Sequence, residues 1–534
     1  MDRRSFLALS AATSATLGCA VATRRTPAEP TGLAPHRDIE EATIAELSAK
    51  MQRGEVTSVA LVDRYIARIE AIDRAGPTLR SVIEIDPDAR AVAAQLDEER
   101  RRRGPRGPLH GIPILVKDNI DTAGRLRTTA GSLALAAAAA PPDAEVAGRL
   151  RGAGGVILGK TNLSEWAYIR SLRSTSGWSA RGGLTRNPYA LDRNPSGSSS
   201  GSAVAVSANL AAAALGTETD GSIVSPSSIC GIVGLKPTVG LVSRAGIIPI
   251  SHTQDTAGPM TRSVADAAIL LGVLAASDPR DPATAAQRGR AIPDYLAALR
   301  ADGARGKRIG VVRSFANISR QVMALFDSAV EDLRRIGAVI VDPVSIGPVA
   351  KLDDPELEVL LYELKAGMAA YFARRPGAPV KTLDDLVRFN RDRPKEELRY
   401  FGQELFEQAA AKGPLTTPAY LEALATCRRL SRDEGIDQAM RTGSLDLLVA
   451  PTGGPAWLTD LLNGDSYTGS SSTPAAVAGY PSVTVPAGML RGLPIGISFF
   501  AGPFSEPTLL AVAHAYEQST RHRAAPRFLP TLEL

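Results

Sequence analysis

Residues 194–202 read Asn-Pro-Ser-Gly-Ser-Ser-Ser-Gly-Ser, and an alanine- and valine-rich segment at 203–214 follows directly. A flexible linker can have the composition of the first segment, but a linker is not normally followed at once by an apolar core helix. We therefore expect residues 203–214 to form a buried helix behind a polar loop. Backbone amides at a helix N-terminus, surrounded by hydroxyl groups, can hold an anion or a reacting group.

A second loop follows the apolar segment and reads Gly216-Thr217-Glu218-Thr219-Asp220-Gly221-Ser222-Ile223, with another serine expected at its surface. Neither loop ends in Gly-Lys-Ser/Thr, which argues against a phosphate-binding loop. The Gly-x-Ser-x-Gly elbow of the α/β-hydrolases is absent from this second loop. The two loops together indicate a serine-based site of another kind.

Helical patterns and short apolar runs alternate on both sides of these loops. Strands are expected at 112–116, ending at Lys117, and at 155–158, 308–312, 338–341, 445–450, 482–485 and 495–500. Helices are expected at 57–73, 88–103, 143–153, 263–275, 321–336 and 506–517. This alternation predicts one large α/β/α layered domain, whose central mixed, largely parallel sheet is flanked by helices. The least regular stretches, 285–305 and 345–440, are the candidates for a cap over the site.

The composition excludes several classes of partner. The net charge of +5, from 61 basic and 56 acidic side chains in 534 residues, is too weak a bias to predict nucleic acid as a partner. The five histidines are scattered without metal-ligand spacing, so no metal and no other cofactor is expected. Cys230 and Cys427 are expected as free thiols. We expect a monomer without a stable membrane span.

Residues 1–30 read as a leader and not as part of the fold. Arg3 and Arg4 are followed by a weakly apolar stretch, Ala8 to Ala22, that is too short to span a membrane stably. This pattern resembles a twin-arginine export signal, which predicts an exported or periplasmic protein. The alternative is a frayed terminus with two chance arginines. Cys19 is also a candidate lipid anchor, since Leu-Gly-Cys-Ala could form a lipoprotein cleavage site there.

The two loops resemble the signature of the amidase signature family. In that family, one serine of a Gly/Ser-rich loop and a second serine further on act with an upstream lysine. In this sequence those positions are Ser198, Ser222 and Lys117. Further segments match in order along the chain: Gly111–Asn119, Leu158–Asn162, Gly231–Thr238, Asp255–Pro259, Ala478–Pro481 and Gly492–Gly496. The resemblance extends from about residue 40 to 520 and implies that residues 31–534 form an amidase catalytic domain.

The resemblance implies that Ser222 is the nucleophile, Ser198 relays the proton and Lys117 is the base. A lysine acts as a base only when neutral, so its pKa must fall from about 10.4 towards 7. Burial at the end of an apolar strand does this if no carboxylate pairs with the amine. Asp118 is adjacent in sequence, but successive side chains of a strand point to opposite faces.

Further backbone features follow from the same resemblance. It implies a cis peptide bond between Gly197 and Ser198. Amide hydrolysis also needs hydrogen-bond donors for the tetrahedral oxyanion. The candidates are the backbone N–H groups of Thr219, Asp220, Gly221 and Ser222.

Two departures from the family pattern bear on the substrate. The family usually has glycine where this chain has Asp220, and arginine where it has Val224. An added acid and a lost base both favour neutral amides over carboxylates. Within the family the chain most resembles bacterial peptide amidases, at residues 176–183, 217–224 and 246–251. This implies hydrolysis of the C-terminal carboxamide of peptides, with release of ammonia.

Other interpretations remain open from the sequence. The substrate could be another small, aryl or fatty amide, or the chain could be an amidotransferase-like subunit that generates ammonia. The non-enzymatic alternative is a binding protein on the same fold, although such a protein would be expected to lose part of the triad. Taken alone, Lys117 could be a surface lysine and Cys230 a packing residue. Trp166 and Trp178 could belong either to the core or to the substrate pocket.

Overall fold

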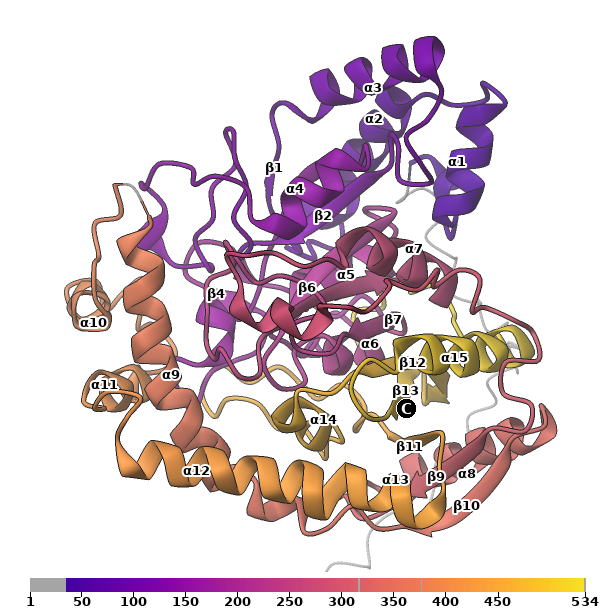
Figure 1. Cartoon of the computed structure of the whole chain (residues 1–534). Coiled ribbons are helices and arrows are strands. Elements are labelled where there is room, and N and C mark those ends of the chain that lie inside the picture. Colours follow the sequence, from indigo (N-terminus) through magenta and orange to yellow (C-terminus); the bar gives the residue numbers. More distant parts are fainter. Residues whose placement is uncertain (1–34, 316, 376, 533–534) are drawn as a thin grey trace, which may run out of the picture. The chain divides into compact units, whose positions relative to one another are not determined.

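Short apolar runs with β-branched residues form the centre of the molecule. In the computed structural model, which describes residues 35–315, 317–375 and 377–532, every residue of Pro113–Lys117 is buried in a strand. The leader expected at 1–30 lies outside the described residues. The main sheet has eleven strands in the order β1-β3-β2-β6-β8-β7-β12-β13-β11-β9-β10 (Figure 1). Its strands are β1 Val82–Ile85, β2 Pro113–Lys117, β3 Val156–Thr161, β6 Ala213–Glu218, β7 Val233–Lys236, β8 Thr256–Thr261, β9 Arg308–Val312, β10 Val339–Val344, β11 Leu447–Pro451, β12 Ser482–Leu490 and β13 Leu493–Phe500.

The sheet is mixed, as predicted. Strand β2 pairs in parallel with both β3 and β6, and β9 pairs in parallel with both β10 and β11. The remaining neighbours in the sheet pair antiparallel. A separate two-stranded sheet consists of β4 Trp178–Ser179 and β5 Gly183–Leu184.

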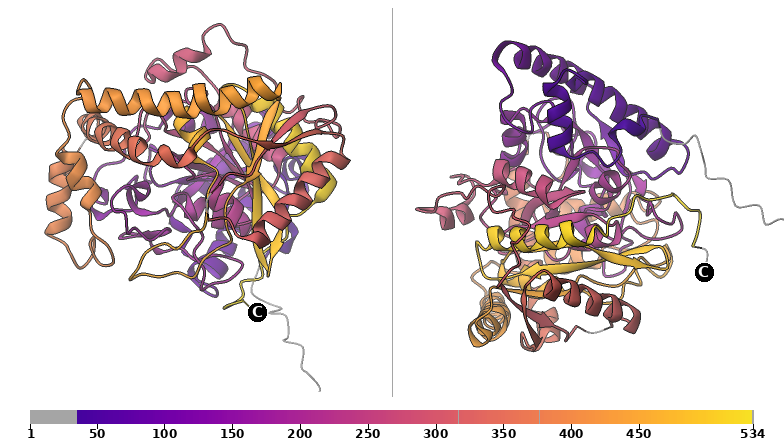
Figure 2. Two further views of the ribbon diagram at one scale, coloured as in Figure 1. Left: turned by 90° about the horizontal axis from the view of Figure 1, so that it is seen from below. Right: turned by 90° about the vertical axis from the view of Figure 1, so that its right-hand side faces the viewer.

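Helices flank the sheet and complete the predicted layered α/β fold. They are α1 Ile44–Gln52, α2 Ser58–Arg68, α3 Ala89–Arg103, α4 Glu145–Gly152, α5 Ser200–Ser207, α6 Val224–Ile229, α7 Val264–Leu274, α8 Arg320–Arg335, α9 Asp353–Ala373, α10 Leu383–Arg391, α11 Glu404–Ala410, α12 Pro418–Arg428, α13 Asp437–Gly443, α14 Thr473–Ala478 and α15 Glu506–Thr520. Helix α15 packs against β12 (Figure 2), and α5 and α6 contact the central strands. The described helices include none that is long and apolar enough to cross a membrane.

The helix expected at 203–214 is wrong in extent. Helix α5 ends at Ser207, and Ala213 already belongs to β6. Alanine favours helix, but the packing of β6 between two other strands overrides that local preference. Asn209 has a left-handed backbone (φ 58°), and the buried Arg262 guanidinium donates to the carbonyl of Ala211 at 2.8 Å. The chain therefore turns after two helical turns and enters the sheet.

The two stretches expected to cap the site behave differently. Residues 345–440 contain α9 to α12, which lie together in the structure (Figure 1). Two of these helices face the cavity described below, through Leu360 and Leu405. None of the described residues that line the cavity comes from 285–305, and Gly303 of this segment lies against the backbone of Ala511 in α15. The expectation of a cap from 285–305 is therefore wrong.

Candidate active site

A fully buried lysine lies at the end of the central strand β2. Lys117 Nζ donates to Ser198 Oγ at 2.8 Å and to Ser199 Oγ at 2.9 Å. It also contacts Thr217, at 2.9 Å to Oγ1 and 3.2 Å to the carbonyl oxygen. The alternative of a surface lysine is excluded, since the residue is 0% exposed.

The surroundings of Lys117 favour the neutral amine. Burial lowers its pKa from the ordinary 10.5 to about 7, although the more distant carboxylates of Glu218 and Asp255 oppose the shift. Among the residues that the structure describes, no carboxylate forms an ion pair with Nζ. Asp118 instead accepts hydrogen bonds from the Thr129 hydroxyl and from the backbone N–H of Gly131. A neutral amine can accept a proton, so Lys117 can act as a base near neutral pH.

The Gly/Ser-rich loop lies directly against Lys117. The peptide bond between Gly197 and Ser198 is cis. The Ser198 carbonyl accepts from the Ser164 backbone N–H at 3.0 Å, and a side chain on Gly197 would collide with the Ser164 hydroxyl. At the next residue, the Ser199 N–H donates to the Ser222 carbonyl at 3.2 Å. These contacts hold the loop beside the segment that contains the second serine.

Ser222 lies between β6 and α6, in a turn with unused donors. The backbone N–H groups of residues 219–222 donate to no acceptor in the described part of the chain. Those of Ile223 and Val224 differ, because both donate to the buried carboxylate of Glu218, at 2.7 and 3.0 Å. Ser222 is 8% exposed, and no hydrogen bond joins its hydroxyl to that of Ser198 in this structure. The turn thus offers a hydroxyl and free N–H donors at one place.

A cavity of about 390 Å³ opens onto both serines. Ser198, Ser222 and residues 219–221 line one side of it. The other walls come from distant parts of the chain: Tyr168, Ile250, Leu360, Leu405, Trp457, Asp465, Tyr467, Ser472 and Thr473. The wall residues from 457–473 could not be predicted from the sequence. That stretch has little regular structure and no periodic pattern, so no signal in a single sequence marks it.

The charged groups that line this cavity are acidic. Asp220 accepts from the hydroxyls of Ser472 and Thr473, the latter at 2.6 Å. Asp465 accepts from the Ser176 backbone N–H at 3.0 Å and from the indole N–H of Trp457 at 3.3 Å. No lysine or arginine is among the described residues that line the cavity. A substrate carboxylate would meet no basic partner there.

The tryptophans and cysteines considered from the sequence are buried and do not line this cavity. Trp166 and Trp178 are both buried, and neither lines this cavity. Trp166 packs against Phe406, and Trp178 packs against Phe401. Cys230 is a buried free thiol, as is Cys427. The described residues contain no group of three or more His, Cys, Asp or Glu side chains arranged to hold a metal ion.

Comparisons with known proteins show the family to which the chain belongs. The model of the Amidase family matches residues 60–510, and a probable amidase of Arabidopsis thaliana is 41% identical, over 92% of each chain. The chain therefore belongs to the amidase family and is an amide-hydrolysing enzyme.

A solved structure and a further relative also match the chain. The crystal structure of a peptide amidase from Stenotrophomonas maltophilia is 54% identical, with a TM-score of 0.88, and the match covers 92% of this chain and 99% of that one. One subunit of the glutamyl-tRNA(Gln) amidotransferase from Chloroflexus aurantiacus is 36% identical, over 92% of this chain and 99% of its own length. Both relatives thus match almost along their full length.

Proposed function

We propose that the chain hydrolyses the C-terminal carboxamide of peptides and releases ammonia, with Ser222 as nucleophile and Lys117 as base. The observation that carries the mechanism is the short contact from Lys117 Nζ to Ser198 Oγ, 2.8 Å, made by a lysine without a carboxylate partner among the described residues. Burial that lowers the lysine pKa to about 7 supports it further. A base with this pKa can activate a hydroxyl group near neutral pH.

In the proposed cycle, Ser222 loses its proton to Ser198, which passes a proton on to Lys117. The Ser222 oxygen attacks the amide carbonyl, and the free N–H groups of residues 219–222 stabilise the resulting oxyanion. The carbon–nitrogen bond breaks as the nitrogen receives a proton through Ser198, and ammonia leaves. Water then cleaves the ester on Ser222. The two serine hydroxyls must form a hydrogen bond for this relay, a contact that commonly tightens only when substrate binds.

Two observations support a neutral peptide amide as the substrate. The cavity has the size of an ordinary small-molecule site, its charged walls are acidic, and several apolar side chains line it. The solved structure of a peptide amidase is 54% identical to this chain. An amidotransferase-like role is the second candidate, and it is favoured by matches to amidotransferase subunits such as the one from Chloroflexus aurantiacus. Free glutamine carries a carboxylate, for which the cavity offers no basic partner among the residues described.

An ammonia-release assay tests the proposal. Purified enzyme is incubated with peptide amides, simple aryl and fatty amides, and glutamine. We expect release from peptide amides, its loss in Ser222→Ala, and its retention in the control Ser225→Ala. Ser225 also lines the cavity, but its hydroxyl hydrogen-bonds to Ser196 at 2.9 Å. Activity that survives in Ser222→Ala would refute the mechanism, and activity on the other amides alone would refute the substrate.

We also propose that the protein is exported. The proposal rests on the twin arginine at Arg3 and Arg4 and the apolar stretch behind it, which lie outside the described residues. The monomeric state and a lipid on Cys19 remain predictions of the same kind. Mass spectrometry of the protein purified from cell fractions would reveal both the cleavage site and any lipid.

A further inference from the structure

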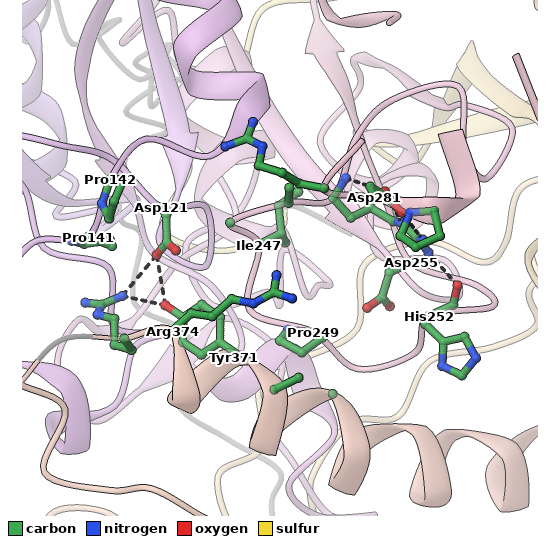
Figure 3. Close-up of a pocket in the computed structure, with 18 of the residues that line it drawn as sticks. Asp121, Pro141, Pro142, Ile247, Pro249, His252, Asp255, Asp281, Tyr371 and Arg374 are labelled. Carbon is green, nitrogen blue, oxygen red and sulfur yellow. Dashed lines mark hydrogen bonds and ion pairs between the residues drawn. The ribbon is translucent and has the colours of Figure 1, made fainter. Parts of the chain in front are cut away.

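The structure contains a second cavity, of about 430 Å³, which Figure 3 shows in close-up. Its walls include the loop that carries Ile247 and Pro249, Tyr371 of helix α9, and Arg374, which directly follows that helix. In Figure 3 the carboxyl group of Asp255 and the guanidinium of Arg374 both face the space beneath Ile247. None of the residues proposed for the catalytic cycle lines this cavity, so it has no role in that chemistry as described so far.

A much smaller cavity, of about 10 Å³, lies between the two. It shares Ala167, Thr219 and Ile250 with the serine cavity. It shares Arg244, Ile247 and Asp255 with the second cavity. A volume of about 10 Å³ is close to the minimum for one water molecule. The two large cavities are therefore separated by a space of the size of one water or one ammonia molecule.

One of the residues that line the small cavity has an unused polar atom. Asn119 lines it and is 2% exposed, and its Oδ1 accepts no hydrogen bond from any described residue. The amide is held by its other end, because Nδ2 donates to Thr217 Oγ1 at 3.0 Å, the same hydroxyl that contacts Lys117. Buried acceptors are nearly always satisfied, by protein or by water. A small molecule with an N–H or O–H group in this space would supply the missing donor.

We propose that the small cavity is a passage through which ammonia leaves the serine site and water enters it. The proposal rests on the amide hydrolysis proposed above. While it is bound to Ser222, the acyl part of a peptide amide fills the serine cavity of about 390 Å³ and closes the mouth of that cavity. Ammonia, once released, is small enough to pass Asn119 and Ile247 into the second cavity. The water that cleaves the ester, which supplies its hydroxyl to the acid and its proton to Ser222, takes the reverse path.

The passage predicts an effect that depends on the size of the acyl group. Ile247→Phe adds bulk to the narrow part, whereas Ala370→Phe adds it at an exposed position on the wall of the second cavity. We expect Ile247→Phe to lower kcat about tenfold for a tetrapeptide amide, but less than about twofold for a single-residue amide that leaves the mouth open. Ala370→Phe should alter neither. An equal loss for both substrates, or no loss, would overturn the proposal.

A crystal structure of the wild-type enzyme gives a readout that needs no activity. We expect one ordered water within hydrogen-bond distance of Asn119 Oδ1, and its absence from Ile247→Phe. An empty, dry space in the wild type would overturn the passage. If instead the water is present and the wild type releases no ammonia from any amide, the proposed function fails and the site for a small molecule stands.

Discussion

Lys117→Met should abolish ammonia release and yet change stability in a pH-dependent way. Methionine keeps the length of the side chain and its apolar stem but cannot be protonated. The lysine that it replaces is buried against three hydroxyl groups, with a pKa lowered from 10.5 to about 7 by that burial. A lysine with a lowered pKa binds fewer protons in the folded than in the unfolded chain. Wild-type stability should therefore rise as the pH increases from about 7 towards 10.5.

The size of the effect follows from the two pKa values. The lysine pKa is 10.5 in the unfolded chain and about 7 in the folded protein. This difference destabilises the fold by about 4 kcal/mol at pH 7 and by about 2 kcal/mol at pH 9. The variant lacks this penalty but also loses the hydrogen bonds from Nζ to Ser198, Ser199 and Thr217, at a cost of about 1 kcal/mol each. That cost is nearly independent of pH. The stability difference between variant and wild type should therefore change by about 2 kcal/mol between pH 7 and pH 9.

Urea unfolding at both pH values measures this change. Lys351→Met, at an exposed position, is the control and should show no such difference. We expect the free energy of unfolding of Lys117→Met, relative to that of the wild type, to be higher at pH 7 than at pH 9. A difference that is the same at both pH values would show that Lys117 carries a proton throughout. The reasoning that makes it a base would then be refuted, even if the variant were inactive.

Three further predictions concern the rate, the packing and the leader. The value of kcat/KM for a peptide amide should rise as the pH increases through about 7, as Lys117 loses its proton, and a flat profile would contradict its role. Gly201→Ala should destabilise the protein by a few kcal/mol in thermal unfolding, because its Cβ would meet the backbone of Asn162, and an unchanged Tm would contradict that packing. Replacing Arg3 and Arg4 together by lysine should leave the enzyme in the cytoplasm in cell fractionation, whereas unimpaired export would refute the twin-arginine proposal.

The sequence predicted those parts of the fold that have local periodicity. Strand β2 begins and ends within one residue of the run predicted at 112–116, and α7 differs by one residue at each end from the helix predicted at 263–275. A polar residue at the end of such a run, like Lys117, can thus be placed by sequence alone. The alanine-rich segment after α5 was predicted to be helical, but its last residues belong to β6. Alanine occurs both in helices and in buried strands, and only contacts with the neighbouring strands decide between the two.

The walls of the cavity were not predictable in the same way. Leu360 and Leu405 belong to helices whose amphipathic patterns are weak or short, and Trp457 and Asp465 belong to an irregular loop. Their positions depend on contacts between parts of the chain that are far apart in sequence. Substrate preference is set by these walls, whereas the proposed proton transfer is set by the two loops and β2. The sequence therefore carries more information about the reaction than about the substrate.

A lowered pKa does not by itself identify the base in this protein. Burial also lowers the pKa of Lys160 and Lys236, each to about 8, and both lie in strands of the same sheet. Lys236 Nζ donates at 3.3 Å to the carbonyl of the next residue, a backbone oxygen that cannot give up a proton. Lys160 Nζ donates to the Ile120 carbonyl and, at 2.9 Å, to the Thr128 hydroxyl, but Thr128 is not among the described residues that line the serine cavity. Lys117 alone among these three contacts serine hydroxyls in the loop beside the cavity. The proposed proton transfer needs a neutral amine and a hydroxyl partner that lies at the cavity, and the contact of β2 with the Gly/Ser-rich loop supplies that partner, Ser198.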